Sequence, residues 1–156
     1  MPYQTALTDL QSKVGTETHL GEWLTIDQAR IDAFAAATLD NQWIHIDPER
    51  ASRESPFGGP VAHGYLTLSL LPHLAGRVNA EKPPYPGLKV SVNYGLNRVR
   101  FPHPVTAGSR IRARTELVSV EEVAGNGLQI VNKITVEIDG AAKPACVAET
   151  VGRMYF

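Results

Sequence analysis

The spacing of apolar side chains predicts two helices in the first half of the chain. Residues 28–37 are rich in alanine, and apolar residues at 31, 34 and 35 suit a helix that is capped by Thr25 or Asp27. Residues 61–78 carry leucines on almost every side, which is typical of a helix that is buried all round. Pro72 lies inside this second stretch, so we expect a kink or a break there.

The second half of the chain has the alternating pattern of strands. Four stretches alternate apolar and polar residues with a period of two, and β-branched side chains are frequent in them. These stretches are residues 88–94, 111–117, 130–138 and, less strictly, 146–154. The turn dipeptides Asn126-Gly127 and Asp139-Gly140 suit a meander of antiparallel strands.

The segments around these elements have weaker patterns. Residues 18–24 have some strand character, which a glycine interrupts, and residues 52–60 hold two prolines and two glycines, which predicts a loop over the surface or over a site. A buried helix followed by a meander indicates an α+β fold in which one antiparallel sheet wraps around a long central helix. Because the edge strands of such a sheet need cover, we expect a homodimer.

Length and composition indicate a single domain that spans residues 1–156. The 15 basic and 16 acidic residues give a net charge of −1, so no overall field attracts nucleic acid or an anionic membrane. No apolar run approaches the length of a membrane span, and the first residues lack the pattern of a signal peptide. We therefore expect a cytoplasmic protein.

The single cysteine, Cys146, allows no internal disulfide, and its apolar surroundings predict a buried core residue.

The most informative chemistry lies in residues 39–48, which read LDNQWIHIDP. Asp40 and His45 are separated by about 140° on a helix and lie on opposite faces of a strand, so they converge only through an irregular turn. The apolar pair Trp43-Ile44 would anchor this turn, and Asp47-Pro48 would close it. The two side chains are either an acid/base pair around one water or a turn aspartate beside a histidine with a local hydrogen bond.

A second group of interest, His63-Gly64, stands at the start of the predicted central helix. In one interpretation His63 caps or packs the helix, and Gly64 is required because space is short. In the other, Gly64 lets a substrate carbonyl approach the unpaired N–H groups of the first helical turn, where developing negative charge is stabilised. A side chain at position 64 would block that approach.

These residues carry a resemblance to a known family. Residues 40–51 resemble the hydratase motif of the MaoC-like, R-specific enoyl-CoA hydratases, whose pattern runs approximately G-D-x-N-P-[LIV]-H-x-D. The resemblance continues through 57–64, Ser69-Leu70, 99–105 and Gly108, and it covers most of residues 34–117. The run Gln-Trp-Ile-His is itself similar to the nodulation-protein-N-like branch of this family.

The resemblance implies a hot-dog fold, a homodimer and the syn hydration of a trans-2-enoyl-CoA to an (R)-3-hydroxyacyl-CoA. It implies that Asp40 and His45 hold and activate the water, and that the backbone N–H of Gly64 supports the enolate oxygen of the thioester. Which of the two side chains takes the proton stays open. No cofactor is implied, because the coenzyme A thioester is itself the substrate.

Substrate-binding roles are implied for a further set of residues, which comprises Gln42, Trp43, His63 and Ser69. For Gln42 and Ser69 a role in packing or in a turn fits the sequence equally well. The chain departs from the family pattern where Leu39 replaces the glycine before the aspartate and where Gln42-Trp43 replaces Asn-Pro. Both catalytic side chains are kept, so we expect changes in turn geometry and in substrate fit, with Trp43 narrowing the acyl pocket.

Two other functions fit a hot-dog scaffold, because a fold does not fix a function. Hot-dog thioesterases resemble one another in placing an Asp or Glu on or near the central helix, whereas this chain has no carboxylate between Glu54 and Glu81. A non-catalytic acyl-binding protein would have no need of Asp40 and His45. We keep both functions as alternatives to the hydratase.

Coenzyme A carries phosphates, which predicts Lys or Arg at the mouth of the pocket. Arg98, Arg100 and Lys89 are the candidates, although solvated strand residues of these types are common. No metal site is predicted, because the histidines show no recognised ligand spacing. They are His19, His45, His63, His73 and His103.

Overall fold

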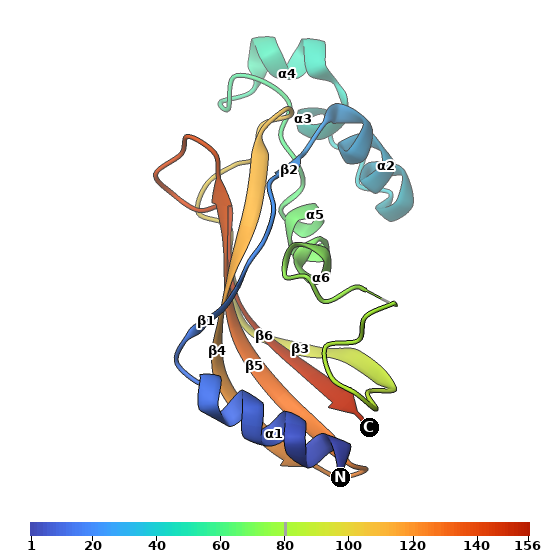
Figure 1. The fold of residues 1–156 in the computed structure, drawn as a ribbon. Helices are drawn as coiled ribbons and strands as arrows, with labels where there is room; N and C mark the ends of the chain where they lie inside the picture. Colours follow the sequence, from blue (N-terminus) through green and yellow to red (C-terminus); the bar gives the residue numbers. More distant parts are fainter. Residues whose placement is uncertain (80) are drawn as a thin grey trace.

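The computed structural model describes residues 1–79 and 81–156, and it shows one curved antiparallel sheet accompanied by helices (Figure 1). The helices are α1 (Pro2–Lys13), α2 (Gln28–Thr38), α3 (Trp43–Ile46), α4 (Pro48–Glu54), α5 (Gly64–Ser69) and α6 (Leu71–Leu74). The strands are β1 (Glu17–Leu20), β2 (Leu24–Thr25), β3 (Val90–Arg100), β4 (Arg110–Val123), β5 (Gly127–Ile138) and β6 (Cys146–Tyr155). The helices α5 and α6 lie against the concave face of the sheet, and α2, α3 and α4 lie beyond one end of it (Figure 1).

The sheet has the strand order β1-β4-β5-β6-β3, and β2 also pairs with β4. Every pair is antiparallel, and β3 forms one edge of the sheet. Each predicted strand is present. Residues 124–126 form the turn between β4 and β5, with Asn126 at a φ of 55°, and Gly127 begins β5. The α+β prediction of an antiparallel sheet wrapped around a central helical segment is confirmed.

The central helical segment agrees with its prediction in one respect and differs in another. The break expected near Pro72 is present, because the helix predicted over 61–78 is divided into α5 and α6. Pro72 lies in the first turn of α6, where its missing N–H would have no partner in any case. The expectation of burial on every side is wrong, because Tyr65 is 70% exposed. Only one side of the segment, with Leu66, Leu71 and Leu74, is buried against the sheet.

The N-terminal helix α1 was not predicted, because few of its positions are apolar. Its buried residues Ala6 and Leu10 pack against Leu117 and Leu128 in a hydrophobic cluster that is separate from the main core. On β5, residues 128 and 130 contact the α1 cluster, whereas residues 134, 136 and 138 contact the main core. Even-numbered side chains of a strand share one face, so α1 and α5–α6 cover the two ends of the same face of the sheet.

Two smaller predictions can be compared with the structure. Cys146 is fully buried as predicted, and burial raises the pKa of its thiol to about 11. Residues 18–24 do contain strand structure, but it is divided at Gly21 into β1 and β2. In the part of the chain that the structure describes, no helix has both the length and the apolar character that a membrane crossing needs.

Candidate active site

The helix α2 delivers the chain to the first residue of the site. Asp27 caps α2 and accepts a hydrogen bond from the backbone N–H of Arg30 at 2.8 Å, which confirms one of the two predicted caps. The helix ends at Leu39, which has a left-handed backbone with a φ of 63°. This conformation turns the chain out of the helix, so that Asp40 lies in the loop beyond it.

The segment that carries His45 is more regular than predicted. In place of an irregular turn, residues 43–46 form the one-turn helix α3, in which the backbone N–H of His45 donates to the carbonyl of Gln42 at 3.0 Å. The helix α4 follows, and Asp47 caps it by accepting from the N–H of Arg50. The predicted loop therefore begins at Ser55 and not at residue 52.

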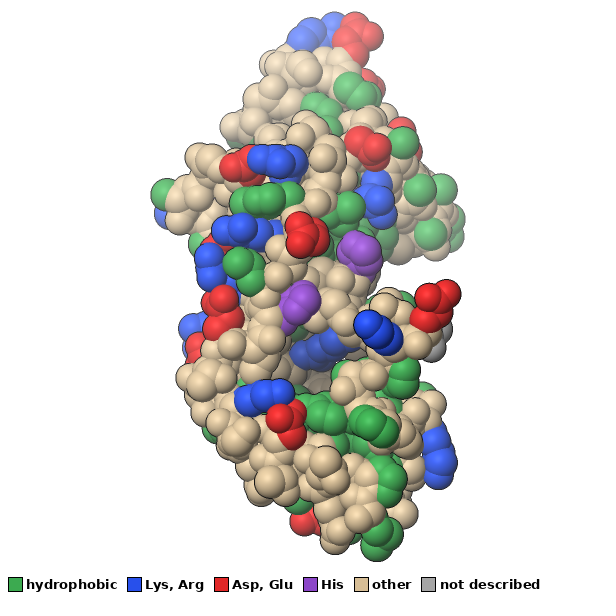
Figure 2. All heavy atoms as spheres, in the orientation of Figure 1, with side chains coloured by type: hydrophobic (Ala, Val, Ile, Leu, Met, Phe, Trp, Pro, Cys, Tyr) green, Lys and Arg blue, Asp and Glu red, His purple; other side chains and the backbone are tan. Residues whose placement is uncertain are grey.

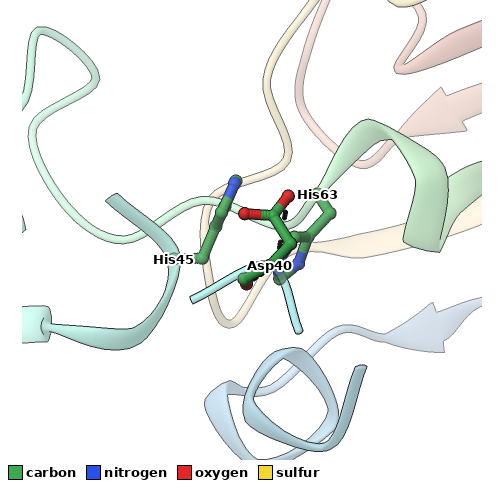
Figure 3. Close-up of side chains that lie close together, drawn as sticks. All are labelled: Asp40, His45 and His63. Atoms are coloured by element: carbon green, nitrogen blue, oxygen red, sulfur yellow. Dashed lines mark hydrogen bonds and ion pairs between the residues drawn. The ribbon is translucent and has the colours of Figure 1, made fainter. Parts of the chain in front are cut away.

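Each buried imidazole makes one hydrogen bond to a backbone carbonyl. Nδ1 of His45 lies 2.6 Å from the carbonyl oxygen of Val61, and Nε2 of His63 lies 3.0 Å from that of Asp40 (Figure 3). A carbonyl oxygen only accepts, so Nδ1 of His45 and Nε2 of His63 carry hydrogens. Neutral His45 therefore keeps an unprotonated Nε2, which is available as a base.

The two imidazole rings are stacked, with centroids 3.7 Å apart and planes 23° from parallel. His45 is 7% exposed and His63 is 3% exposed, while the ring of Phe34 lies 5.0 Å from that of His63. The Asp40 side chain is 52% exposed, and its Oδ2 lies 4.0 Å from Nε2 of His63. The site thus combines a solvent-accessible carboxylate with two buried imidazoles.

The buried surroundings favour the neutral form of His45. Burial lowers the pKa of His45 below its ordinary value of 6.5, and the nearby His63 adds to this effect. The hydrogen bond to Val61 and the charge of Asp40 act in the opposite direction but do not reverse the shift. His45 is therefore uncharged at neutral pH, as a proton acceptor must be.

The first residue of α5, Gly64, has little free space on its side-chain face. A Cβ atom at this position would lie 3.0 Å from the ring of Phe101, closer than ordinary van der Waals contact. The steric interpretation of Gly64 is thus supported. Its backbone N–H has no acceptor within α5, because the first N–H groups of a helix have none.

The other predicted substrate-binding residues are dispersed. Gln42 is exposed before α3, and Trp43 is half-buried with the guanidinium of Arg50 4.3 Å from its ring centroid. Ser69 is exposed at the end of α5, and its hydroxyl donates to the carbonyl of Tyr65 at 2.7 Å. Ser69 lines a cavity whose described lining includes neither Asp40 nor either stacked histidine. The structure therefore brings together Asp40, His45 and His63, and not Ser69.

Sequence reasoning missed two groups that orient His45. The carbonyl of Val61 fixes the ring, and Nε2 of Gln28 donates to the carbonyl of His45 at 2.7 Å and to Oδ1 of Asp32 at 2.8 Å. A backbone carbonyl leaves no side-chain signal in a sequence. Gln28 is the first residue of α2, where a polar residue is unremarkable.

The arrangement also bears on metal binding. Donor atoms of Asp40, His45 and His63 all lie within 4.8 Å of one another, although their spacing along the chain suggested no ligand set. A metal bound to both imidazoles must lie in both ring planes at about 2 Å from each nitrogen. The planes of two stacked rings only 23° from parallel meet far from the rings, so this geometry fits a metal poorly.

The three basic residues considered for coenzyme A lie on or beside β3. Lys89, Arg98 and Arg100 are all exposed, and Arg100 donates to the carbonyl of the neighbouring Val99 at 2.7 Å. Their positions allow contact with phosphates and equally with solvent. Their role in binding coenzyme A stays a prediction.

Comparison with known proteins places this geometry in context. The model of the family described as MaoC like domain matches residues 9–138. The 3-hydroxyacyl-thioester dehydratase Z of Mycobacterium tuberculosis is 47% identical over 148 residues, which are 95% of this chain and 95% of that protein. Nodulation protein N of Rhizobium leguminosarum bv. viciae is 42% identical over 154 residues, which are 99% of this chain and 94% of that protein.

A solved structure supports the fold assignment. The (R)-hydratase from A. caviae involved in PHA biosynthesis superposes with a TM-score of 0.61 and 26% sequence identity. The match covers 86% of this chain and 95% of that one. The antiparallel sheet and its central helical segment are therefore those of the hot-dog fold that the sequence predicts.

The backbone at Leu39 generates a stability prediction. Leu39 is 81% exposed, so its side chain gains little from burial, while a left-handed backbone costs a non-glycine residue about 1–2 kcal/mol. After the extra conformational entropy of glycine is subtracted, Leu39→Gly should raise the free energy of unfolding by about 0.5–1 kcal/mol. Urea denaturation measures this change. Leu39→Ala is the matched control, because it removes the side chain and keeps the strain; a Leu39→Gly protein no more stable than it would contradict the prediction.

The lowered pKa of His45 generates a prediction about pH. The folded protein resists the proton that the unfolded chain takes up near pH 6.5, so stability should be lost as the pH falls below that value. NMR titration should find a pKa for His45 below 6.5 in the folded protein. The free energy of unfolding should also fall less steeply with acid in His45→Gln than in the unaltered protein. A His45 pKa above 6.5 would refute the prediction.

Proposed function

Because the chain belongs to the MaoC-like domain family of hydratases and dehydratases, we propose that it is an R-specific enoyl-CoA hydratase. On this proposal it adds water syn to a trans-2-enoyl-CoA, giving an (R)-3-hydroxyacyl-CoA, and it catalyses the reverse dehydration. The observation that carries the proposal is the convergence of Asp40 and His45 beside the start of α5. Hydration of an enoyl thioester needs a base, a group that orients the water and a donor for the enolate oxygen, and His45, Asp40 and the N–H of Gly64 are suited to these three roles.

We assign the proton transfer to His45. Its Nδ1 hydrogen is held by Val61, so Nε2 takes one proton of the water while the oxygen attacks the β-carbon of the substrate. The exposed Asp40 carboxylate accepts the other hydrogen of the water and orients it. On this proposal His45 takes the proton and Asp40 orients the water.

The developing charge then moves to the thioester. As the new C–O bond forms, the electrons of the double bond shift to the thioester oxygen, and the N–H of Gly64 donates to that enolate oxygen. The protonated His45 next returns its proton to the α-carbon on the face from which water was added, which gives syn addition. The helix α5 has only 6 residues, so the N–H group itself matters more than the helix dipole.

Two of the residues predicted to bind the substrate, Gln42 and Trp43, keep that role in this proposal. Trp43 and Gln42 flank the start of α3, beside the residues that handle the water, and we propose that they contact the acyl chain or the thioester. His63 acts by position, since it holds the carbonyl of Asp40 and supports the ring of His45.

We further propose a homodimer formed through β3. This edge strand exposes four large apolar side chains, namely Val90, Val92, Tyr94 and Leu96. An exposed apolar edge strand invites pairing with a second copy of itself.

The thioesterase alternative receives little support from the central segment. Neither α5 nor α6 contains an Asp or Glu, so no carboxylate on this segment is placed to activate water toward a thioester carbonyl. A non-catalytic acyl-binding protein is compatible with the fold but leaves the buried, neutral His45 unexplained.

The proposal predicts loss of the enoyl absorbance of crotonyl-CoA or a longer enoyl-CoA. Asp40→Asn and His45→Gln should each slow this reaction by about a hundredfold or more, the usual effect of removing an acid/base group. Glu49→Gln and His73→Gln are matched controls at exposed positions, and both should keep full activity. Chiral analysis of the 3-hydroxyacyl product should give the R form.

Other outcomes would decide against the hydratase. Equal rates in Asp40→Asn, His45→Gln and the control variants would remove the assigned roles. Release of free thiol from a saturated acyl-CoA, without loss of enoyl absorbance, would favour the thioesterase. Tight binding of acyl-CoA with neither reaction would favour the non-catalytic protein.

A further inference from the structure

The concave face of the sheet is left uncovered between its two helical covers. A cavity of about 300 Å³ lies there, lined by residues of α5, α6, β3, β5 and β6. The space-filling view shows a hollow in this part of the molecule (Figure 2). It lies below the two places where histidine atoms are visible, and a basic side chain can be seen inside it. Neither α1 nor α5–α6 fills this space, so a ligand can occupy it.

The lining of the cavity combines apolar and polar side chains, although it lies on the apolar face of the sheet. Its apolar lining includes Leu68, Leu71 and Ile134, whereas Arg77 and Thr150 contribute polar groups. Oγ1 of Thr150 is buried, and no described residue offers it a hydrogen-bond partner. A buried hydroxyl without a partner is costly, which indicates that something else satisfies it.

Arg77 is the one charged side chain among the described residues that line the cavity. No described carboxylate lies within ion-pair distance of its guanidinium. Partial desolvation lowers the pKa of Arg77, but a guanidinium stays charged at neutral pH. The Arg77 side chain is nevertheless exposed to solvent, so its guanidinium is accessible to a ligand. A guanidinium with no ionic partner among the described residues attracts an anion, and its planar fork suits a carboxylate or a phosphate.

The floor of the cavity makes room for this guanidinium. Gly152 lies beneath it, and a Cβ atom at that position would be 3.9 Å from Nη1 of Arg77. The neighbouring strand contributes Gly95, where a Cβ would meet nothing within 4 Å. Because glycine has no side chain, these two positions leave part of the cavity open for a ligand beside Arg77.

The cavity lies within reach of the proposed reaction. The helix α5 begins at Gly64 and ends at Ser69, which lines the cavity. Five residues of helix rise about 7.5 Å, which is the distance to the near end of the cavity. A short acyl chain covers this distance, and the longer pantetheine arm extends past it toward its phosphates. A thioester whose oxygen meets the N–H of Gly64 can therefore extend along α5 into the cavity.

We propose that this cavity binds a negatively charged group of the thioester substrate, with Arg77 as the residue that recognises it. This inference rests on the proposed function and adds the chemical class of the substrate. The anion is a carboxylate or a phosphate, and it has two possible sources: the far end of the acyl chain or the phosphates of coenzyme A.

The test compares pairs of substrates with variants of the arginine. The first pair is trans-2-hexenoyl-CoA and trans-2-hexenedioyl-CoA, which differ in the terminal carboxylate. The second pair is the N-acetylcysteamine thioesters of the same acids, which lack the phosphates. The kcat/KM of each is measured for the unaltered protein, for Arg77→Gln and Arg77→Lys, and for the matched control Arg53→Gln on the exposed face of α4.

The expected result is a selective loss in Arg77→Gln. If the acyl carboxylate is bound, kcat/KM falls at least about tenfold more for both hexenedioyl thioesters than for the hexenoyl ones. If a phosphate is bound, the same excess loss separates both coenzyme A thioesters from both N-acetylcysteamine thioesters. Arg77→Lys should retain part of the selectivity, since it keeps the charge, and Arg53→Gln should change nothing.

Equal losses on all four substrates would overturn the inference. Equal losses together with a changed oligomeric state on size-exclusion chromatography would assign Arg77 to the contact between copies, which also overturns it. Calorimetry with adipoyl-CoA, hexanoyl-CoA and the N-acetylcysteamine thioester of hexanoic acid separates this inference from the proposed function, because the three ligands differ in the terminal carboxylate and in the phosphates. Tighter binding of the ligands that carry one of these anions, lost in Arg77→Gln, supports the cavity even without turnover, whereas turnover without any Arg77 selectivity refutes the cavity alone.

Discussion

Two reciprocal hydrogen bonds hold the site together. His45 donates to the carbonyl of Val61, while His63, two residues beyond Val61, donates to the carbonyl of Asp40. The backbone adds a third link from the N–H of Val61 to the carbonyl of Ile44 at 3.0 Å. Each imidazole is thus bonded to the other segment, so neither ring can rotate without losing a contact that the opposite segment needs. The position of Asp40 relative to His45, and the protonated nitrogen of each ring, follow from this arrangement.

Backbone hydrogen bonds beside the sheet hold the segment that carries Val61 and His63 in place. Val61 forms a bridge with Thr106, and the N–H of Ala62 donates to the carbonyl of Val105 at 2.8 Å, which anchors the second segment. Two features of the site are energetically unfavourable. Leu39 has a left-handed backbone, and the buried Nδ1 of His63 has no hydrogen-bond partner among the described residues. Strain and unpaired polar groups of this kind persist where the surrounding structure imposes them, and they are frequent at functional sites.

Much of this could be predicted from the sequence, because strong local patterns have local causes. The alternation of the strands, the cap at Asp27 and the combination of Asp40 with His45 are visible in the printed residues. The helix α1 escaped prediction because its stability comes from packing onto β4 and β5, not from its own pattern. The orientation of His45 depends on a backbone carbonyl 16 residues away, and the cavity of Arg77 exists only because two distant helices cover the sheet incompletely. Such features are properties of the fold and leave no mark in a short stretch of sequence.

We infer that the reciprocal hydrogen bonds fix opposite tautomers of the two imidazoles and leave Nε2 of His45 free to act as the base. Long-range correlation of imidazole nitrogens and ring hydrogens by NMR, at a pH above the ordinary histidine pKa of about 6.5, tests this inference directly. We expect a hydrogen on Nδ1 of His45 and on Nε2 of His63. A hydrogen on Nε2 of His45, or rapid exchange between the tautomers of either ring, would contradict it.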